Sequence, residues 1–180
     1  MSKNICIVPV ELNDYSLIEN LVLYLNQTFE FPVHVKTANI KPHLAYDQRR
    51  LQYSSSILLK QLIDNSPEPL NQSKFLALCE FDLFIPIFTY VFGEAQLNGP
   101  AAIVSVHRLQ NEFYGGSSDR EVLRERLIKE ATHELGHTFG LYHCLHPKCV
   151  MNFSTYVEDI DDKSPLFCDQ CKAEVIAGGE

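Results

Sequence analysis

Three histidines and one glutamate stand close together in the string HELGHTFGLYH. His133 and His137 are four residues apart, so on a helix their rings share one face, about one turn apart. Glu134 follows His133 directly and is expected beside a bound metal ion, where a base acting on metal-bound water belongs. Gly140 permits the chain to reverse after the helix, because glycine readily adopts positive φ. His143 would then complete a set of three imidazole ligands.

This ligand set is typical of a catalytic zinc site. Three neutral imidazoles leave one position of a tetrahedral zinc ion open for water, and zinc lowers the pKa of that water to ~7. We therefore expect hydrolysis of peptide bonds by attack of the zinc-bound water, with Glu134 as general base and then as proton donor to the departing amine. The alternative is a helix with chance surface histidines, but this spacing arises at random in only ~3 in 100,000 such chains.

Four cysteines follow the third histidine at once: Cys144, Cys149, Cys168 and Cys171. Two close pairs, C-x4-C and C-x2-C, are typical of a structural tetrahedral zinc, which would bring the total to two zinc ions per chain. Because neighbouring side chains point apart, His143 can face one metal and Cys144 the other. The alternatives are a redox-active C-x2-C pair, unrelated buried thiols, and His146 in place of one cysteine.

Length and charge restrict the class of protein. The chain has 180 residues, enough for one domain, and its 15 basic and 23 acidic residues give a net charge of −8. An acidic chain without a basic run argues against nucleic acid as a partner. No apolar stretch reaches the ~20 residues that a membrane span needs, and the start MSKNICIVPV lacks the features of a signal peptide. We expect a cytoplasmic monomer with reduced thiols, in which Cys6 and Cys79 are inert core residues.

Apolar periodicity predicts the elements that position these residues. The expected order is a strand at 4–10, a helix at 16–29, a strand at 31–40, a helix at 48–63, strands at 74–81, 88–94 and 101–109, and a long helix. Ser118 and Glu121 fit a capping box at the start of that last helix, which should end at about residue 137 or 139. Its apolar residues Leu123, Leu127, Ala131 and Leu135 lie opposite the histidines.

The pattern becomes irregular after Gly140. Cys, Pro, Asn and Asp replace regular periodicity, so we expect one metallopeptidase domain with an upper subdomain at 1–140 and a small C-terminal subdomain at 141–180. The smaller part lacks a core of its own. A metal held by the four cysteines would supply its folding energy.

The string HELGHTFGLYH resembles the metzincin signature. Continued through the four cysteines and Met151, it resembles the archaemetzincins, and weaker likeness extends to TYVFGEAQ at 89–96, AIVSVHRL at 102–109 and FYG at 113–115. The resemblance implies an α+β fold, a twisted mixed sheet with a backing helix and an active-site helix. It also implies that Met151 forms a Met-turn beneath the histidines, and that the edge strand in 88–98 pairs with an extended peptide or unstructured protein substrate.

The chain departs from some metzincins two residues after the methionine. Those proteins have a tyrosine there, whereas this chain has Phe153, which carries no oxygen. Tyr142, Tyr156 and His107 are the residues whose type would allow them to replace it. Besides an endopeptidase or aminopeptidase, two interpretations stay open. One is a low-turnover or inactive protein that binds peptides or partners, and the other is an interaction domain that uses only the four-cysteine zinc.

Overall fold

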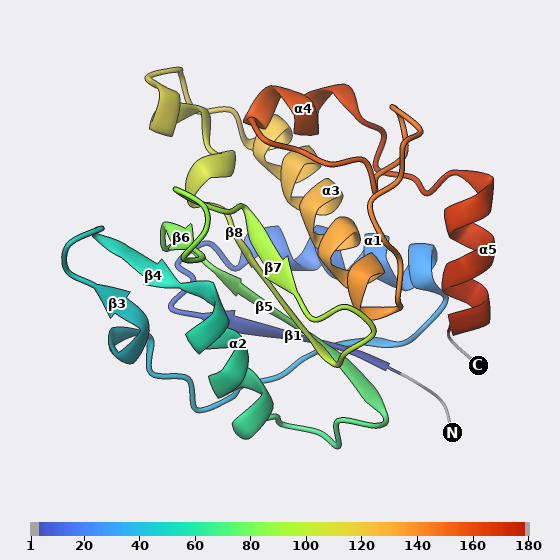
Figure 1. The fold of residues 1–180 in the computed structure, drawn as a ribbon, viewed down its shortest axis with the longest axis horizontal. Coiled ribbons are helices and arrows are strands. Elements are labelled where there is room, and N and C mark those ends of the chain that lie inside the picture. The colour runs from blue at the N-terminus through green and yellow to red at the C-terminus, as the bar shows by residue number, and fades with distance from the viewer. Residues whose placement is uncertain (1–3, 179–180) are drawn as a thin grey trace.

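A five-stranded twisted mixed sheet forms the centre of the protein (Figure 1). The computed structural model describes residues 4–178. Across the sheet the strands are β2 (Val33–Val35), β1 (Asn4–Val10), β5 (Ser73–Cys79), β8 (Ala101–Ser105) and β7 (Gly93–Ala95). The first four run parallel, whereas β7 pairs antiparallel with β8 and forms one edge. A smaller sheet contains β3 (Tyr46–Asp47), β4 (Gln52–Ser54) and β6 (Leu83–Phe84).

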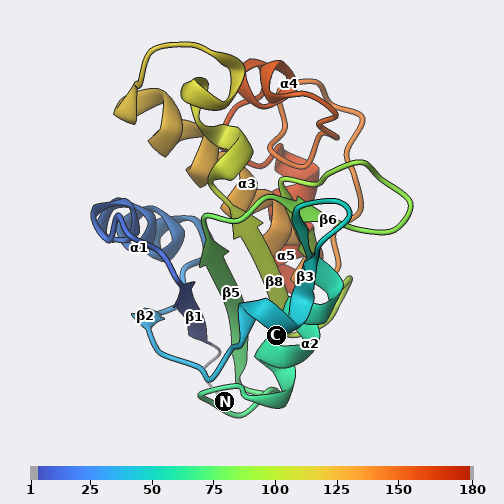
Figure 2. The same ribbon diagram turned by 90° about the vertical axis from the view of Figure 1, so that its left-hand side faces the viewer.

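Alternating apolar residues bury both faces of the central sheet. In β1, Ile5 and Ile7 pack on one side, while Cys6 and Val8 pack on the other, as the two-residue period of a strand requires. Helices α1 (Ser16–Phe29) and α3 (Arg120–Thr138) cover the first side, and α2 (Ser55–Asp64) covers the second (Figure 2). The strand at 4–10 and the helix at 16–29 are confirmed. This layered arrangement packs α3 against β7 and β8.

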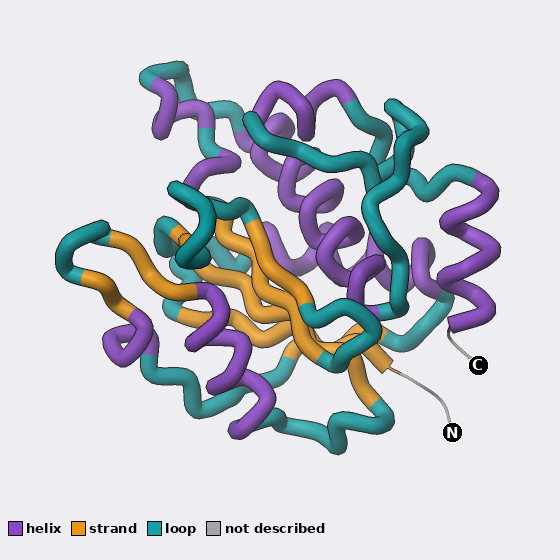
Figure 3. Tube along the Cα trace, in the orientation of Figure 1, coloured by secondary structure: helices purple, strands orange, loops and turns teal. Residues whose placement is uncertain are grey.

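Two helices and long loops form the C-terminal part of the chain (Figure 3). The helices are α4 (Val157–Asp162) and α5 (Asp169–Gly178), which the irregular sequence pattern after Gly140 does not predict. Val150, Met151 and Ile160 are fully buried and belong to the same apolar core as α1 and α3. The tail therefore packs on the core of the main sheet, as a segment without its own core must. The division at residue 140 stays a prediction.

Three expected elements are shorter than predicted. The strand expected at 31–40 is only β2, because the chain then leaves the sheet and the Gln61 side chain bonds both backbone groups of Lys41. The strand expected at 88–94 is only β7, because Arg50 binds the Phe88 carbonyl and so takes that group away from any strand pairing. The strand expected at 101–109 ends at Ser105 and is followed by a 3-10 turn, His107–Leu109.

The helix expected at 48–63 begins later, at Ser55. Residues 52–54 form β4 instead, and the Ser54 hydroxyl accepts a hydrogen bond from the Ile57 N–H as the helix cap. Short 3-10 helices also occur at Pro42–Ala45 and Asn111–Tyr114. Among residues 4–178, none of the helices has the length and apolar character that crossing a membrane demands.

Asp119, not the predicted Ser118, is the N-cap residue of α3. One oxygen of its carboxylate accepts hydrogen bonds from the N–H groups of Glu121 and Val122, at 3.0 and 3.1 Å. A carboxylate at the positive end of the helix dipole also gains electrostatic energy, which a serine hydroxyl lacks. The capping box expected at Ser118 and Glu121 is therefore wrong by one residue.

We expect Asp119→Ala to lower the free energy of unfolding by about 1 kcal/mol, because two N–H groups lose their acceptor. Ser118→Ala, its exposed neighbour, should have a clearly smaller effect. Urea denaturation followed by circular dichroism measures both. Equal losses in the two variants would contradict the assignment of Asp119 as the cap.

Candidate active site

The last turns of α3 carry the first three predicted site residues. Leu127, Ala131 and Leu135 are buried on the side of the sheet, as predicted. His133 and His137 leave the helix on the other side, and their Nε2 atoms lie 3.1 Å apart. The helical spacing thus brings two imidazole nitrogens together at one point.

Gly140 ends α3 and returns the chain toward these imidazoles. Its φ is +96°, a conformation that costs other residues energy. The N–H of Gly140 donates to the His137 carbonyl, and the N–H of Leu141 donates to the Gly136 carbonyl. These two bonds form a Schellman motif, so the turn is a regular helix ending and places His143 opposite the helix.

Backbone carbonyls orient two of the three rings. The Nδ1 atom of His133 lies 2.8 Å from the Val150 oxygen, and Nδ1 of His137 lies 2.7 Å from the Leu141 oxygen. A carbonyl oxygen only accepts, so each Nδ1 must carry the proton and donate it. Each Nε2 atom then presents a lone pair, the form in which imidazole binds a metal ion.

The geometry of the three histidines fits a zinc ion. Their nearest ligand atoms all lie within 4.8 Å of one another. Two nitrogens bound to a tetrahedral zinc lie about 3.3 Å apart, close to the observed spacing of the helix pair. Burial lowers the pKa of His133, His137 and His143 in the metal-free protein. The rings are therefore held neutral, as metal ligation requires.

Glu134 is packed tightly between α3 and the edge strand β7. Its side chain is 7% exposed, and burial, followed by the charge of Glu130, raises its pKa well above the usual range. Gly93 provides the space, because a Cβ atom there would lie 2.7 Å from Glu134 Cγ. The edge strand therefore fixes the position of the carboxylate beside the histidines.

The four predicted cysteines form a second cluster. Their sulfur atoms lie within 4.8 Å of one another, and Cys144 Sγ is 3.8 Å from Cys168 Sγ. Two thiolates on a tetrahedral zinc lie about 3.8 Å apart, given Zn–S bonds of about 2.3 Å. The N–H of Cys168 points at Cys149 Sγ at 3.3 Å, as in sites where backbone donors stabilise thiolates. The cluster therefore fits a zinc ion with four sulfur ligands.

Three other sulfur or histidine residues stay outside this cluster. His146 is exposed and belongs to neither group of metal-ligating residues, which does not favour it as a replacement for a cysteine. Cys6 and Cys79 are fully buried in the core on the α2 side, and burial raises the pKa of the Cys79 thiol to about 12. A thiol in that state is unreactive at neutral pH, as predicted for these two cysteines.

Met151 packs against α3 at Gly136. It is fully buried, and a Cβ atom on Gly136 would lie only 2.5 Å from its sulfur. The glycine within the HELGH string therefore lets the methionine approach the helix backbone. The Met151 carbonyl also accepts the N–H of Cys144, at 2.8 Å. This bond joins Met151 to the loop that carries His143.

A cavity of about 370 Å³ opens over the histidines and Glu134. Its walls are mostly apolar and aromatic, and they come from the segment 85–95, from α3 and from residues 153–156. Phe153 and Tyr156 line it, whereas Tyr142 is 74% exposed and lies outside it. His107 instead stacks edge-to-face on Phe113. Of the three expected substitutes for the missing tyrosine, only Tyr156 faces the cavity.

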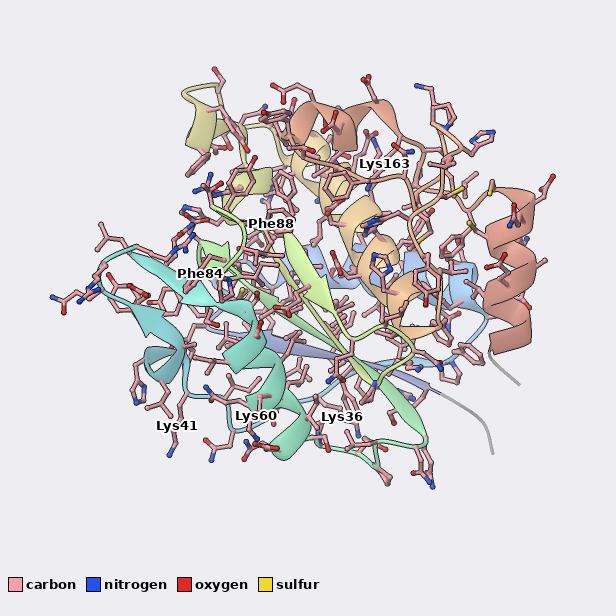
Figure 4. All side chains as sticks on the ribbon, viewed as in Figure 1. Lys36, Lys41, Lys60, Phe84, Phe88 and Lys163 are labelled. Carbon is pink, nitrogen blue, oxygen red and sulfur yellow. The ribbon has the colours of Figure 1, made fainter. Side chains whose placement is uncertain are left out.

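A buried ion pair that includes the cavity-lining residue Glu130 is not predicted by any sequence pattern. Lys163 Nζ lies 2.9 Å from a Glu130 carboxylate oxygen, and the two side chains are 1% and 4% exposed. Figure 4 shows Lys163 in the C-terminal part of the chain beside α3, while Lys36, Lys41 and Lys60 lie near α2. The partners are 33 residues apart in sequence and no short motif links them. Together they join the tail to the active-site helix.

The chain is similar in fold and sequence to known zinc peptidases. A family model described as "Peptidase family M54" matches residues 8–176. The archaemetzincin of Methanocaldococcus jannaschii is 37% identical over 172 residues, which cover 95% of this chain and 92% of that one. The crystal structure of archaemetzincin from Methanopyrus kandleri has a TM-score of 0.86 at 34% identity, covering 98% and 95% of the two chains.

A crystal structure of a "zinc-dependent peptidase" from Methanocorpusculum labreanum also has a TM-score of 0.86, at 31% identity, and covers 96% of this chain and 100% of that one. The likeness confirms the mixed sheet with its flanking helices, and it defines the class of the protein as zinc metallopeptidase, a hydrolase. The chain belongs to peptidase family M54, and the resemblance to archaemetzincins seen in its sequence is confirmed.

We expect Lys163→Met to lower the free energy of unfolding by about 3–5 kcal/mol, because it leaves the Glu130 carboxylate buried without its partner. Replacing both partners, with Glu130→Gln and Lys163→Met, should recover much of this loss since no charge stays buried. Lys60→Met is a matched control, because it breaks the exposed pair with Asp64, where the side chains are 74% and 54% exposed. Chemical denaturation measures these changes. If Lys163→Met lowered the free energy of unfolding no more than Lys60→Met, the proposed contribution of the buried pair to stability would be wrong.

Proposed function

We propose that this chain hydrolyses peptide bonds at the three-histidine site, with Glu134 as general base. One observation carries the proposal: the histidine nitrogens converge on one point, and the buried Glu134 lines the same cavity as the three histidines. His133, His137 and His143 would hold the catalytic zinc. When bound there, zinc supplies Lewis acidity for the peptide carbonyl and makes water acidic enough to lose a proton at neutral pH.

Glu134 moves the proton in this proposal. Its carboxylate accepts a proton from the attacking water while the water oxygen forms a bond to the carbonyl carbon. When the carbon–nitrogen bond breaks, Glu134 returns the same proton to the amine nitrogen, so the products are a carboxylic acid and an amine. The close packing of Gly93 against the Glu134 side chain supports this role, because it restricts the positions that the carboxylate can take.

The edge strand β7 is suited to hold the substrate. Gly93 and Ala95 line the cavity, and within residues 4–178 β7 pairs with β8 on one side only. An extended peptide could add to the other side by backbone hydrogen bonds. Its side chains would then meet mostly apolar and aromatic walls, and a cavity of about 370 Å³ lies in the range of small-molecule and side-chain sites.

We further propose that Cys144, Cys149, Cys168 and Cys171 hold a structural zinc. The sulfur spacing supports this assignment. Closed four-sulfur sites have no open position for substrate, so their role is stability rather than catalysis. Because His143 and Cys144 are adjacent, this metal would fix the loop that delivers the third histidine.

Glu134→Gln should lower kcat by ~100- to 10,000-fold, the range that general acid–base catalysis contributes, while leaving zinc content and fold intact. Glu125→Gln is the matched control, since it makes the same change at an exposed position of the same helix. A digest of a peptide library by zinc-loaded protein measures both activity and preference. Cleavage by Glu134→Gln at the rate of the Glu125→Gln protein would rule out the base role.

Metal counting tests the two sites separately. We expect two zinc ions per chain, and one after His133→Ala is combined with His137→Ala, because the cysteine cluster is untouched. Mass spectrometry under native conditions or elemental analysis gives the number. A single zinc that survives the histidine changes but disappears with Cys149→Ser would instead favour a zinc-stabilised interaction domain.

A further inference from the structure

A hydrogen bond joins two segments of the chain that line the cavity. Tyr90 lies in the cavity-lining segment 88–93, which we call the first rim, and Thr155 lies in the cavity-lining segment 153–156, which we call the second rim. The Tyr90 hydroxyl donates to the Thr155 carbonyl oxygen at 2.8 Å. We call this contact the Tyr90–Thr155 bridge. A chain of atoms from one rim to the other is an obstacle to any peptide that runs along the cavity past this point.

The Tyr90 ring is held in place by a charged neighbour. The Arg108 guanidinium lies 4.0 Å from the centre of the ring, in position for a cation–π contact. Arg108 is itself fixed by two hydrogen bonds to the Asp82 carboxylate, at 2.6 and 2.7 Å. Phe92 packs edge-to-face on the ring from another direction, with centres 5.5 Å apart. The ring would therefore keep its place even without its hydroxyl.

The backbone on both sides of the bridge is also fixed. Arg50 donates to the Phe88 carbonyl at 2.7 Å, and the Gln52 side chain donates to the Thr89 carbonyl at 3.0 Å. Figure 4 shows Phe88 on the loop that leads into β7. On the other rim, one oxygen of Asp159 accepts the N–H groups of Thr155 and Tyr156, both at 2.8 Å. Neither rim is a free loop that a substrate could easily push aside.

The place of Tyr90 in the sequence limits how many residues of an extended substrate can lie between Gly93 and the bridge. Tyr90 precedes Gly93 by three residues, and Gly93 lies directly against Glu134. Extended chain rises about 3.3 Å per residue, so the Tyr90 Cα lies no more than ~10 Å along the chain from the Cα of Gly93, the residue that packs on Glu134. An extended substrate beside this rim would meet Tyr90 after about three residues.

We propose that the Tyr90–Thr155 bridge closes one end of the substrate cleft and limits to about three the substrate residues bound on that side of the scissile bond. Tyr90 is thus a specificity-determining residue that selects substrates by the length of chain beyond the cleavage point. This inference rests on the proposed cleavage at Glu134, because that site defines where the count begins.

Two nested peptide series test the bridge. Both share one core sequence that the zinc-loaded protein cleaves; one series is lengthened at the amino end and the other at the carboxyl end. For wild type, kcat/KM should fall about tenfold or more in one series once the chain passes the bridge, which reports lost transition-state binding. The other series should show no such fall, and the series that falls identifies the closed side.

Variants at Tyr90 should change this length dependence. Tyr90→Ala removes both the ring and the hydroxyl, so long and short peptides of the limited series should become equally good substrates. Tyr24 supplies the matched control, because its hydroxyl also donates to a backbone carbonyl of the C-terminal part, Pro165, at 2.8 Å, yet it does not line the cavity. Tyr24→Ala should keep the wild-type ratio of long to short peptides, even if both variants lose some stability.

The outcomes separate this inference from the catalytic one. Cleavage that depends on Glu134 but shows no limit in either series, or a limit that Tyr90→Ala leaves unchanged, overturns the bridge alone. Cleavage that persists in Glu134→Gln overturns the catalytic proposal instead. Binding of the same peptides to the Glu134→Gln protein, followed by fluorescence anisotropy, measures the length limit without turnover and must agree with the kinetic result if the bridge acts as proposed.

Discussion

The adjacency of His143 and Cys144 is the constraint on which the rest of the site depends. The helix alone can supply two imidazoles, so the third must come from a loop that has little regular structure. The Schellman turn at Gly140 sends the chain back, and the next few residues reach both clusters: the histidine enters one and the cysteine enters the other. The Met151 carbonyl accepts the N–H of Cys144, and the Val150 carbonyl accepts the Nδ1–H of His133, so these bonds join the same turns. A metal in the proposed cysteine site would therefore stabilise the geometry of the catalytic site.

From Arg126 onward nearly every residue of α3 is buried, and burying the charged side chains among them has an energetic cost. Charged residues on α3 avoid this cost by pairing with the C-terminal part of the chain: Arg126 binds Asp161 through two hydrogen bonds at 2.7 Å, and Glu130 pairs with Lys163. Each pair also joins the C-terminal part of the chain to α3. The Tyr90–Thr155 bridge joins the same part to the segment before β7. The contacts that stabilise the C-terminal part therefore also shape the proposed substrate site.

Much of the site could be predicted from the sequence because its spacing is local. His133, Glu134 and His137 share one helix, and the cysteine pairs are typical of zinc ligands, so both clusters are formed by the residues expected. Other parts depend on contacts between distant segments. Lys163 beside Glu130, and Tyr90 across from Thr155, have no signature in sequence order. Helix and strand ends were missed where side chains compete for backbone groups, as Asp119 does at the start of α3 and Arg50 does at Phe88.

The most direct test of this account is the zinc affinity of the histidine site when the cysteine site is disrupted. Competition with a chelator would measure it in wild type, in Cys149→Ser combined with Cys171→Ser, and in Cys79→Ala, which removes a buried thiol elsewhere. We predict that the double cysteine variant, still folded by circular dichroism, binds zinc at the histidines at least about tenfold more weakly, the usual effect of losing a group that orients a metal ligand. Affinity equal to that of wild type and Cys79→Ala would contradict the account, because His143 would then be held without the cysteine metal.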